Sequence, residues 1–228
     1  MQTGKITENV TRIKKEIEKG NPFGERVMLV GAIKTQTVDA INEAITAGLD
    51  AVAENKPQEF RDKNDYLLPC TRHFIGHLQT NKVKYLVGKV ELFHSCDRDD
   101  LADEIAKLSV KKGVVSNVLV QINIGEELTK GGYAYDDAEK VVARLNETDG
   151  LHVQGLMAML PDTDDEKLLR DLAKKMRALF DKLKAQYMDF IYLSMGMSGD
   201  YKLCIEEGSN MIRLGSTIFG ARDYTVNA

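Results

Sequence analysis

A lysine stands at the end of the first long apolar run of the chain. Lys34 directly follows VMLVGAI (27–33), a run with the composition of a strand that is buried on both faces. A lysine that emerges there is partly desolvated, so its pKa falls and its amine can attack an aldehyde to form a Schiff base. The alternative is a lysine that closes the strand and extends to solvent.

Two segments rich in glycine and serine could bind a phosphate. Gly215 and Ser216 follow the apolar run 211–214 and precede a short segment with helical potential. Exposed backbone N–H groups at such a place bind anions. The segment SMGMSGD (194–200), which contains Ser198, offers hydroxyls and flexible backbone for the other half of a cradle. The alternative is a pair of turns without a ligand.

Arg213 lies inside the apolar run 211–214. On an extended strand its side chain shares a face with Gly215, two residues later. An unpaired guanidinium is costly to bury. We therefore expect Arg213 to pair either with a carboxylate in the core or with an acceptor on a ligand.

The histidines and cysteines do not show the spacing of a metal site. His73 and His77 are four residues apart, but no third ligand lies near them in the sequence. Cys70, Cys96 and Cys204 are an odd number without metal-ligand spacing, which suits a reducing cytosol. We expect no metal.

Eight short apolar runs alternate with amphipathic stretches along the chain. The runs cover residues 27–33, 49–53, 73–76, 90–94, 118–123, 153–159, 191–195 and 211–214. Residues 169–183 carry a helical stripe between two of them, and residues 6–17 predict an extra helix at the N-terminus. Strand–helix alternation predicts a parallel sheet, and eight units of about 28 residues favour a closed (β/α)8 TIM-type barrel. An open doubly wound sheet is the alternative, although no GxGxxG or P-loop supports it.

In such a barrel, the polar residues that end the strands line one mouth. Lys34, Asn55 and His77 follow three of the runs in this way. We expect the ligand there.

Length and composition set the broad class. The 228 residues include 31 Lys plus Arg and 35 Asp plus Glu, a net charge of -4 that argues against a dedicated nucleic-acid or membrane-surface protein. No run approaches the roughly 18 apolar residues of a membrane helix, and residues 1–20 lack the pattern of a signal peptide. We expect one domain over residues 1–228, in the cytoplasm.

Motifs spread over nearly the whole chain resemble one family. They are VGAIKT (30–35), AENKPQE (53–59), HFIGHLQTNK (73–82), HSCD (94–97), LTKGG (128–132), GLMAM (155–159), SMGMSGD (194–200) and RLGSTIFGAR (213–222). Together they resemble the pyridoxal-phosphate homeostasis proteins, the YggS/PROSC family.

The resemblance implies a fold-type III barrel, related to the N-terminal domain of the alanine racemases, that holds pyridoxal 5′-phosphate (PLP) as a Schiff base on Lys34. It also implies that Arg213 faces the pyridine nitrogen. The cofactor-binding residues that it implies are Lys34, Asn55, His77, Ser198, Arg213, Gly215 and Ser216.

Three places depart from the usual family pattern. Ile33 stands where a serine is usual, AENKPQE replaces the more common GEN-R-QE, and Arg72 stands where a tryptophan is frequent. None of these changes removes a group that the family bonds to PLP.

The resemblance implies a PLP-binding protein of vitamin B6 homeostasis, with no catalytic residues and little or no turnover. It would buffer or supply PLP, or transfer it to PLP-dependent enzymes, with effects on amino-acid and keto-acid balance. An arginine at the pyridine nitrogen leaves that nitrogen unprotonated and weakens the cofactor as an electron sink. The chain ends six residues after Arg222, so we expect no β-rich second domain of the racemase kind, and a monomer.

Three alternatives remain open. One is a weak PLP-dependent amino-acid racemase that uses Lys34 and a second base. Another is a barrel that binds a phosphorylated sugar, or forms a substrate Schiff base, without PLP. The third is a purely structural role.

Overall fold

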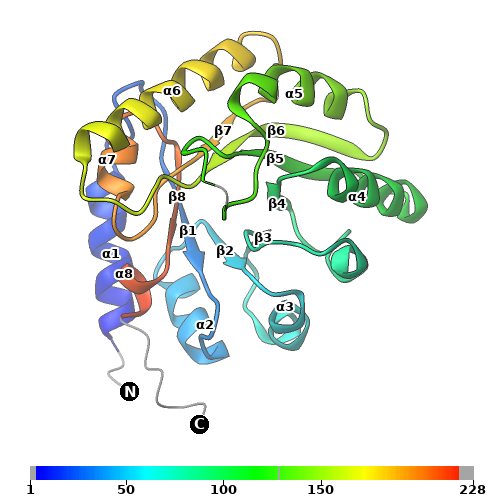
Figure 1. Ribbon diagram of the computed structural model, residues 1–228. Coiled ribbons are helices and arrows are strands. Elements are labelled where there is room, and N and C mark those ends of the chain that lie inside the picture. The colour runs from blue at the N-terminus through cyan, green and yellow to red at the C-terminus, as the bar shows by residue number, and fades with distance from the viewer. Residues whose placement is uncertain (1–3, 128, 221–228) are drawn as a thin grey trace.

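Eight parallel strands form a closed barrel in the computed structural model, which describes residues 4–127 and 129–220 (Figure 1). The strands are β1 (Met28–Ala32), β2 (Ala51–Glu54), β3 (Thr71–Phe74), β4 (Leu92–Cys96), β5 (Ser116–Ile122), β6 (Leu151–Ala158), β7 (Tyr192–Ser194) and β8 (Met211–Leu214). Each strand pairs with the next, and β8 pairs with β1. The predicted closed barrel is confirmed, and the open sheet is wrong. The motif residues Leu128, Ala221 and Arg222 lie outside the described residues.

Helices surround the strands (Figure 1). They are α1 (Lys5–Ile17), α2 (Val38–Thr46), α3 (Pro57–Lys63), α4 (Asp99–Lys112), α5 (Ala138–Asn146), α6 (Glu166–Lys184), α7 (Tyr201–Glu206) and α8 (Ser216–Phe219), with 3-10 turns η1 (Asn64–Tyr66), η2 (Thr80–Tyr85) and η3 (Tyr135–Asp137). Among the described residues, no helix has both the length and the apolar character needed to cross a membrane.

The extra N-terminal helix covers the place where the barrel closes. Val10, Ile13 and Ile17 of α1 are buried and share a core cluster with Leu29 of β1 and Ile212 of β8. The helix after β8 is only four residues long, so it cannot cover that outer face alone. The helix predicted at residues 6–17 is therefore confirmed, and it covers the outer face of β1 and β8.

The inside of the barrel has an apolar layer below a polar one. Six strands contribute buried side chains to one apolar cluster, which includes Leu92, Met157 and Met211. Side chains two residues apart share a face of a strand. His94 and Arg213, two residues beyond Leu92 and Met211, therefore lie in the next layer toward the carboxyl ends, and both are buried.

The third strand begins and ends two residues earlier than the sequence predicts. It was expected at residues 73–76 with His77 at its end, but β3 stops at Phe74. His77 therefore lies in the following loop. The segment after it, Thr80–Tyr85, is a 3-10 helix.

A bulge in β6 requires glycine. The pairing of β5 with β6 shifts between Val118 and Leu119, and Gly155 has a φ of +152°. A Cβ at Gly155 would lie 1.8 Å from the carbonyl oxygen of Tyr192 on β7. No side chain fits there without moving the neighbouring strand.

We predict that Gly155→Ala lowers the free energy of unfolding by about 3 kcal/mol or more, because it combines backbone strain with a backbone clash. Gly113→Ala is the matched control, since Gly113 has a φ of +66° but no atom within 4 Å of its Cβ position. Strain alone costs it about 1–2 kcal/mol. Urea denaturation measures the free energy of unfolding of both variants. An equal decrease in Gly155→Ala and Gly113→Ala would show that the backbone clash at the bulge contributes nothing.

Candidate functional site

Lys34 sits in a tight turn at the carboxyl end of β1. The N–H of Gln36 donates to the carbonyl oxygen of Ile33 at 3.1 Å, which closes a four-residue turn. Thr35, the third residue of this turn, has a φ of +64°, a value that normally favours glycine or asparagine. The turn holds the half-buried Lys34 at the mouth of the barrel.

The two segments expected to bind phosphate lie against each other. The hydroxyl oxygen of Ser198 accepts the N–H of Thr217, in α8, at 3.3 Å. Gly215 lies beside β1, because a Cβ there would be 3.6 Å from the carbonyl oxygen of Ala32. Ser216 is exposed at the start of α8. The structure therefore brings both segments to the end of the strand that carries Lys34.

Arg213 is buried among neutral partners. Its Nη1 donates to the carbonyl oxygen of Ser194 at 2.9 Å and to Ser194 Oγ at 2.6 Å, and its Nη2 donates to the carbonyl oxygen of Ala158 at 3.0 Å. Of the two expected kinds of partner, a core carboxylate is not among these hydrogen-bond acceptors, and an acceptor on a ligand stays a prediction. Burial lowers the pKa of Arg213 to about 10, so the guanidinium still carries its charge at neutral pH.

A chain of hydrogen bonds continues from Arg213 across the barrel. Ser194 Oγ lies 3.1 Å from His94 Nδ1, and His94 Nε2 lies 3.0 Å from His73 Nδ1. Burial lowers the pKa of His73 to about 4 and that of His94 well below its usual value, so both rings are neutral. The sequence analysis assigned neither histidine to the site. The available signal was spacing, since His94 follows the inward-facing Leu92 by two residues.

Asn55 follows β2 and presents an acceptor that the described residues do not satisfy. Its N–H donates to Glu54 Oε1 at 2.7 Å. Its side-chain Oδ1 is buried and accepts no hydrogen bond from any described residue. A buried acceptor left in that state costs about 1–3 kcal/mol, so Asn55 fits a ligand that donates a hydrogen bond.

His77 stands apart from the other expected residues. Its side chain is 68% exposed, and its Nδ1 lies 3.2 Å from Oδ2 of Asp97, beyond β4. Asp97 also accepts Arg98 Nη1 at 2.7 Å. Asp97 follows β4, and β4 lies four strands from β8, the strand that carries Arg213, in the closed barrel.

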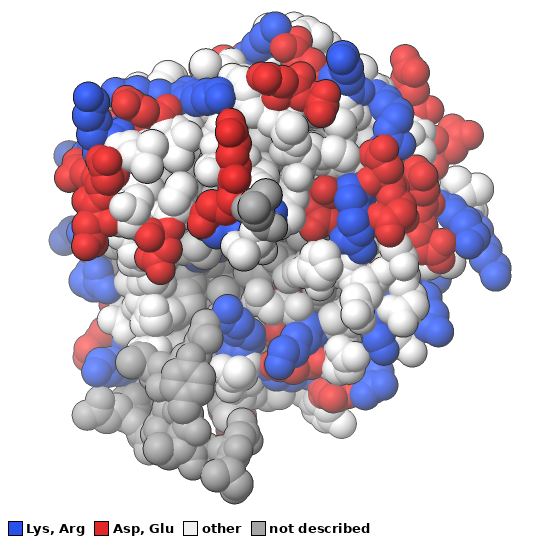
Figure 2. Space-filling view, viewed as in Figure 1, with Lys and Arg blue, Asp and Glu red and all other residues white. Residues whose placement is uncertain are grey.

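Charges of both signs alternate over the face seen in Figure 2, with no large area of one sign. In residues 4–127 and 129–220, no three His, Cys, Asp or Glu side chains form a group that could hold a metal ion.

The two neutral histidines predict how stability changes with pH. The unfolded chain binds protons at these rings near pH 6.5, whereas the folded rings resist protonation. The unfolded state therefore holds more protons below that pH. We predict that each ring lowers the free energy of unfolding by up to about 1.4 kcal/mol per pH unit as pH falls from about 6 to about 5. Urea denaturation of the wild type and His73→Gln tests this, since the variant must show the shallower slope. Equal slopes would contradict it.

The chain is similar to curated proteins over most of its length. It is 40% identical over 223 residues to the pyridoxal phosphate homeostasis protein of Aquifex aeolicus, covering 96% of this chain and 98% of that protein. It is 36% identical over 207 residues to the protein of the same name from Escherichia coli K12, covering 88% of each.

Solved structures show the same fold. PipY of Synechococcus elongatus with PLP bound matches 94% of this chain and 100% of its own, with a TM-score of 0.82 and 28% identity. An alanine racemase of Clostridium difficile 630 matches 98% of this chain and 57% of its own, with a TM-score of 0.78 and 15% identity, which shows the fold alone. The model of the alanine racemase N-terminal domain matches residues 1–223, and the chain belongs to that family, among its pyridoxal phosphate homeostasis proteins.

Proposed function

We propose that this protein binds PLP as a Schiff base on Lys34 and acts in PLP homeostasis. The observation that carries the proposal is the pairing of β1 with β8, in which Val30 lies opposite Arg213. This pairing places the amine of Lys34, which follows β1, on the strand next to the one that carries the buried guanidinium of Arg213 and the Gly215–Ser216 turn. These groups match the aldehyde, ring nitrogen and phosphate of PLP.

Each residue has a definite part in this arrangement. The ε-amino group of Lys34 condenses with the aldehyde that PLP supplies, with loss of one water. Ser198, Gly215 and Ser216 hold the phosphate, and Arg213 donates to the ring nitrogen. The unsatisfied Oδ1 of Asn55 accepts a hydrogen bond from the ligand, and His77 lines the open side of the mouth. The PLP-bound neighbour PipY supports the choice of ligand.

The protein carries PLP and does not turn substrate over. Arg213 keeps its proton at neutral pH, because its pKa stays at about 10 despite burial. It therefore does not protonate the ring nitrogen, and the cofactor is a weak electron sink. The names of the curated relatives support a homeostasis role. The protein acts as a single-barrel monomer in the cytoplasm and releases PLP to PLP-dependent enzymes.

We predict that the purified protein takes up PLP with a visible Schiff-base absorption band. Borohydride reduction followed by peptide mapping must place the label on Lys34, because its amine stands at the mouth beside β8. Lys34→Ala must lose the band, whereas the matched variants Lys82→Ala and Lys130→Ala must keep it. A label on another lysine, or no band at saturating PLP, would contradict the proposal.

A racemase is the second candidate, because the model of the alanine racemase N-terminal domain matches residues 1–223. It needs a second base besides Lys34, and the exposed His77 is the residue tested for that role. We predict that the PLP-loaded protein in D2O exchanges the Cα proton of amino acids no faster than free PLP does, as measured by proton NMR. Faster exchange that is lost in both Lys34→Ala and His77→Ala would instead establish racemase chemistry.

A further inference from the structure

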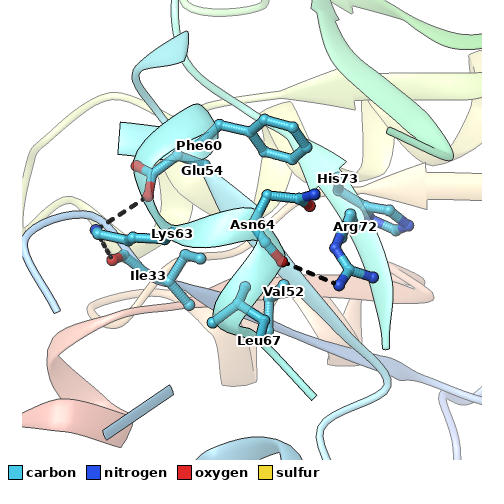
Figure 3. Close-up of a pocket in the computed structure, with 9 residues that line it drawn as sticks. All are labelled: Ile33, Val52, Glu54, Phe60, Lys63, Asn64, Leu67, Arg72 and His73. Atoms are coloured by element: carbon cyan, nitrogen blue, oxygen red, sulfur yellow. Dashed lines mark hydrogen bonds and ion pairs between the residues drawn. The ribbon is translucent and has the colours of Figure 1, made fainter. Parts of the chain in front are cut away.

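A small ion cluster lies behind the turn that carries Lys34. Lys63, the last residue of α3, places its Nζ 2.7 Å from Glu59 Oε2 and 3.3 Å from Glu54 Oε2. Glu54 is 1% exposed and the Lys63 side chain only 16% exposed. Figure 3 shows Lys63 turned toward Glu54 and the backbone of Ile33. The apolar side chains of Val52, Phe60 and Leu67 line part of the same pocket. Apolar walls strengthen such charge pairs.

This cluster holds both peptide groups that flank Lys34. The Lys63 ammonium donates to the carbonyl oxygen of Ile33 at 3.3 Å. Glu59 Oε2 accepts the N–H of Thr35 at 2.9 Å. A β-branched residue at the φ of Thr35, +64°, costs about 1–3 kcal/mol and persists only where its surroundings over-determine it. Glu59 supplies one such constraint and Lys63 the other.

The same cluster reaches the second strand end. Glu54 Oε1 accepts the N–H of Asn55, while Glu54 Oε2 faces Lys63. One ammonium thus ties the turn after β1 to the residue after β2. Without it, Glu59 would keep the exposed Lys56, 3.6 Å from its Oε1, whereas the buried Glu54 would lose the ammonium that faces it.

We propose that Lys63, with Glu54 and Glu59, is a positioning cluster that fixes Lys34 and Asn55 relative to each other and so slows the loss of PLP. The proposal rests on the proposed function. None of the three side chains needs to touch the cofactor. They act through the backbone on either side of Lys34 and through the N–H of Asn55.

The test compares Lys63→Met, which removes the ammonium and keeps an apolar stem, with Lys63→Arg, which keeps a cation. From PLP-loaded protein, Lys63→Met must lose PLP to an excess of an apo-enzyme acceptor at least tenfold faster than the wild type, and Lys63→Arg must recover most of that loss. In ligand-free protein, NMR must show at least tenfold faster exchange of the Thr35 amide in Lys63→Met. Should Lys63→Met fail to fold, Glu59→Gln provides both readouts.

Arg177→Met is the matched control for general destabilisation. Arg177 is also partly buried, with Nη1 2.6 Å from Glu25 and Nη2 2.7 Å from Asp181, but Glu25 precedes β1, at the opposite end of the barrel. This variant must lose thermal stability and keep the wild-type rate of PLP loss. Equal acceleration in Lys63→Met and Arg177→Met would overturn the positioning role, as would a wild-type rate in Lys63→Met. A wild type that takes up no PLP would instead contradict the proposed function.

Discussion

The hydrogen-bonded pairing of β8 with β1 is the constraint on which the site depends. It closes the barrel and joins the two ends of the fold, with Met28 opposite Met211 and Val30 opposite Arg213. Without this closure, Lys34 and Gly215 would be remote from each other. The helix α8 is too short to shield the junction, so α1 packs across it with Val10 and Ile13. The N-terminal helix thus stabilises the site without contributing a residue to it.

Closure also creates the polar upper layer of the core. Arg213 is buried without a carboxylate, which would be costly if its donors were unpaired. Backbone carbonyls and Ser194 satisfy them instead, and His94 and His73 extend the chain of hydrogen bonds across the barrel. None of these hydrogen-bond partners carries a negative charge, so they do not neutralise the positive charge of Arg213. That charge is then available to a ligand at the mouth.

Much of the fold was predictable, because buried strands and amphipathic helices have distinct apolar periods. The eight runs match the eight strands within a few residues, and the extra helix appears where residues 6–17 placed it. The partners of Arg213 were not predictable, since they depend on the register of strands that are distant in sequence. The spacing of Glu59 and Lys63 is visible on a helix, but their bonds to Thr35 and Ile33 exist only once α3 has packed against β2, the strand next to β1. His77 was placed at a strand end because the run 73–76 continues past the point where β3 stops.

In the proposed function, Lys34 and the Gly215–Ser216 turn after β8 hold opposite ends of one PLP molecule. A crystal structure of the protein grown with PLP tests it most directly. We expect continuous electron density between Lys34 Nζ and the cofactor, with the phosphate against Gly215 and Ser216 and the ring nitrogen at Arg213. Density joined to a different lysine, or a phosphate held away from the β8 turn, would contradict it.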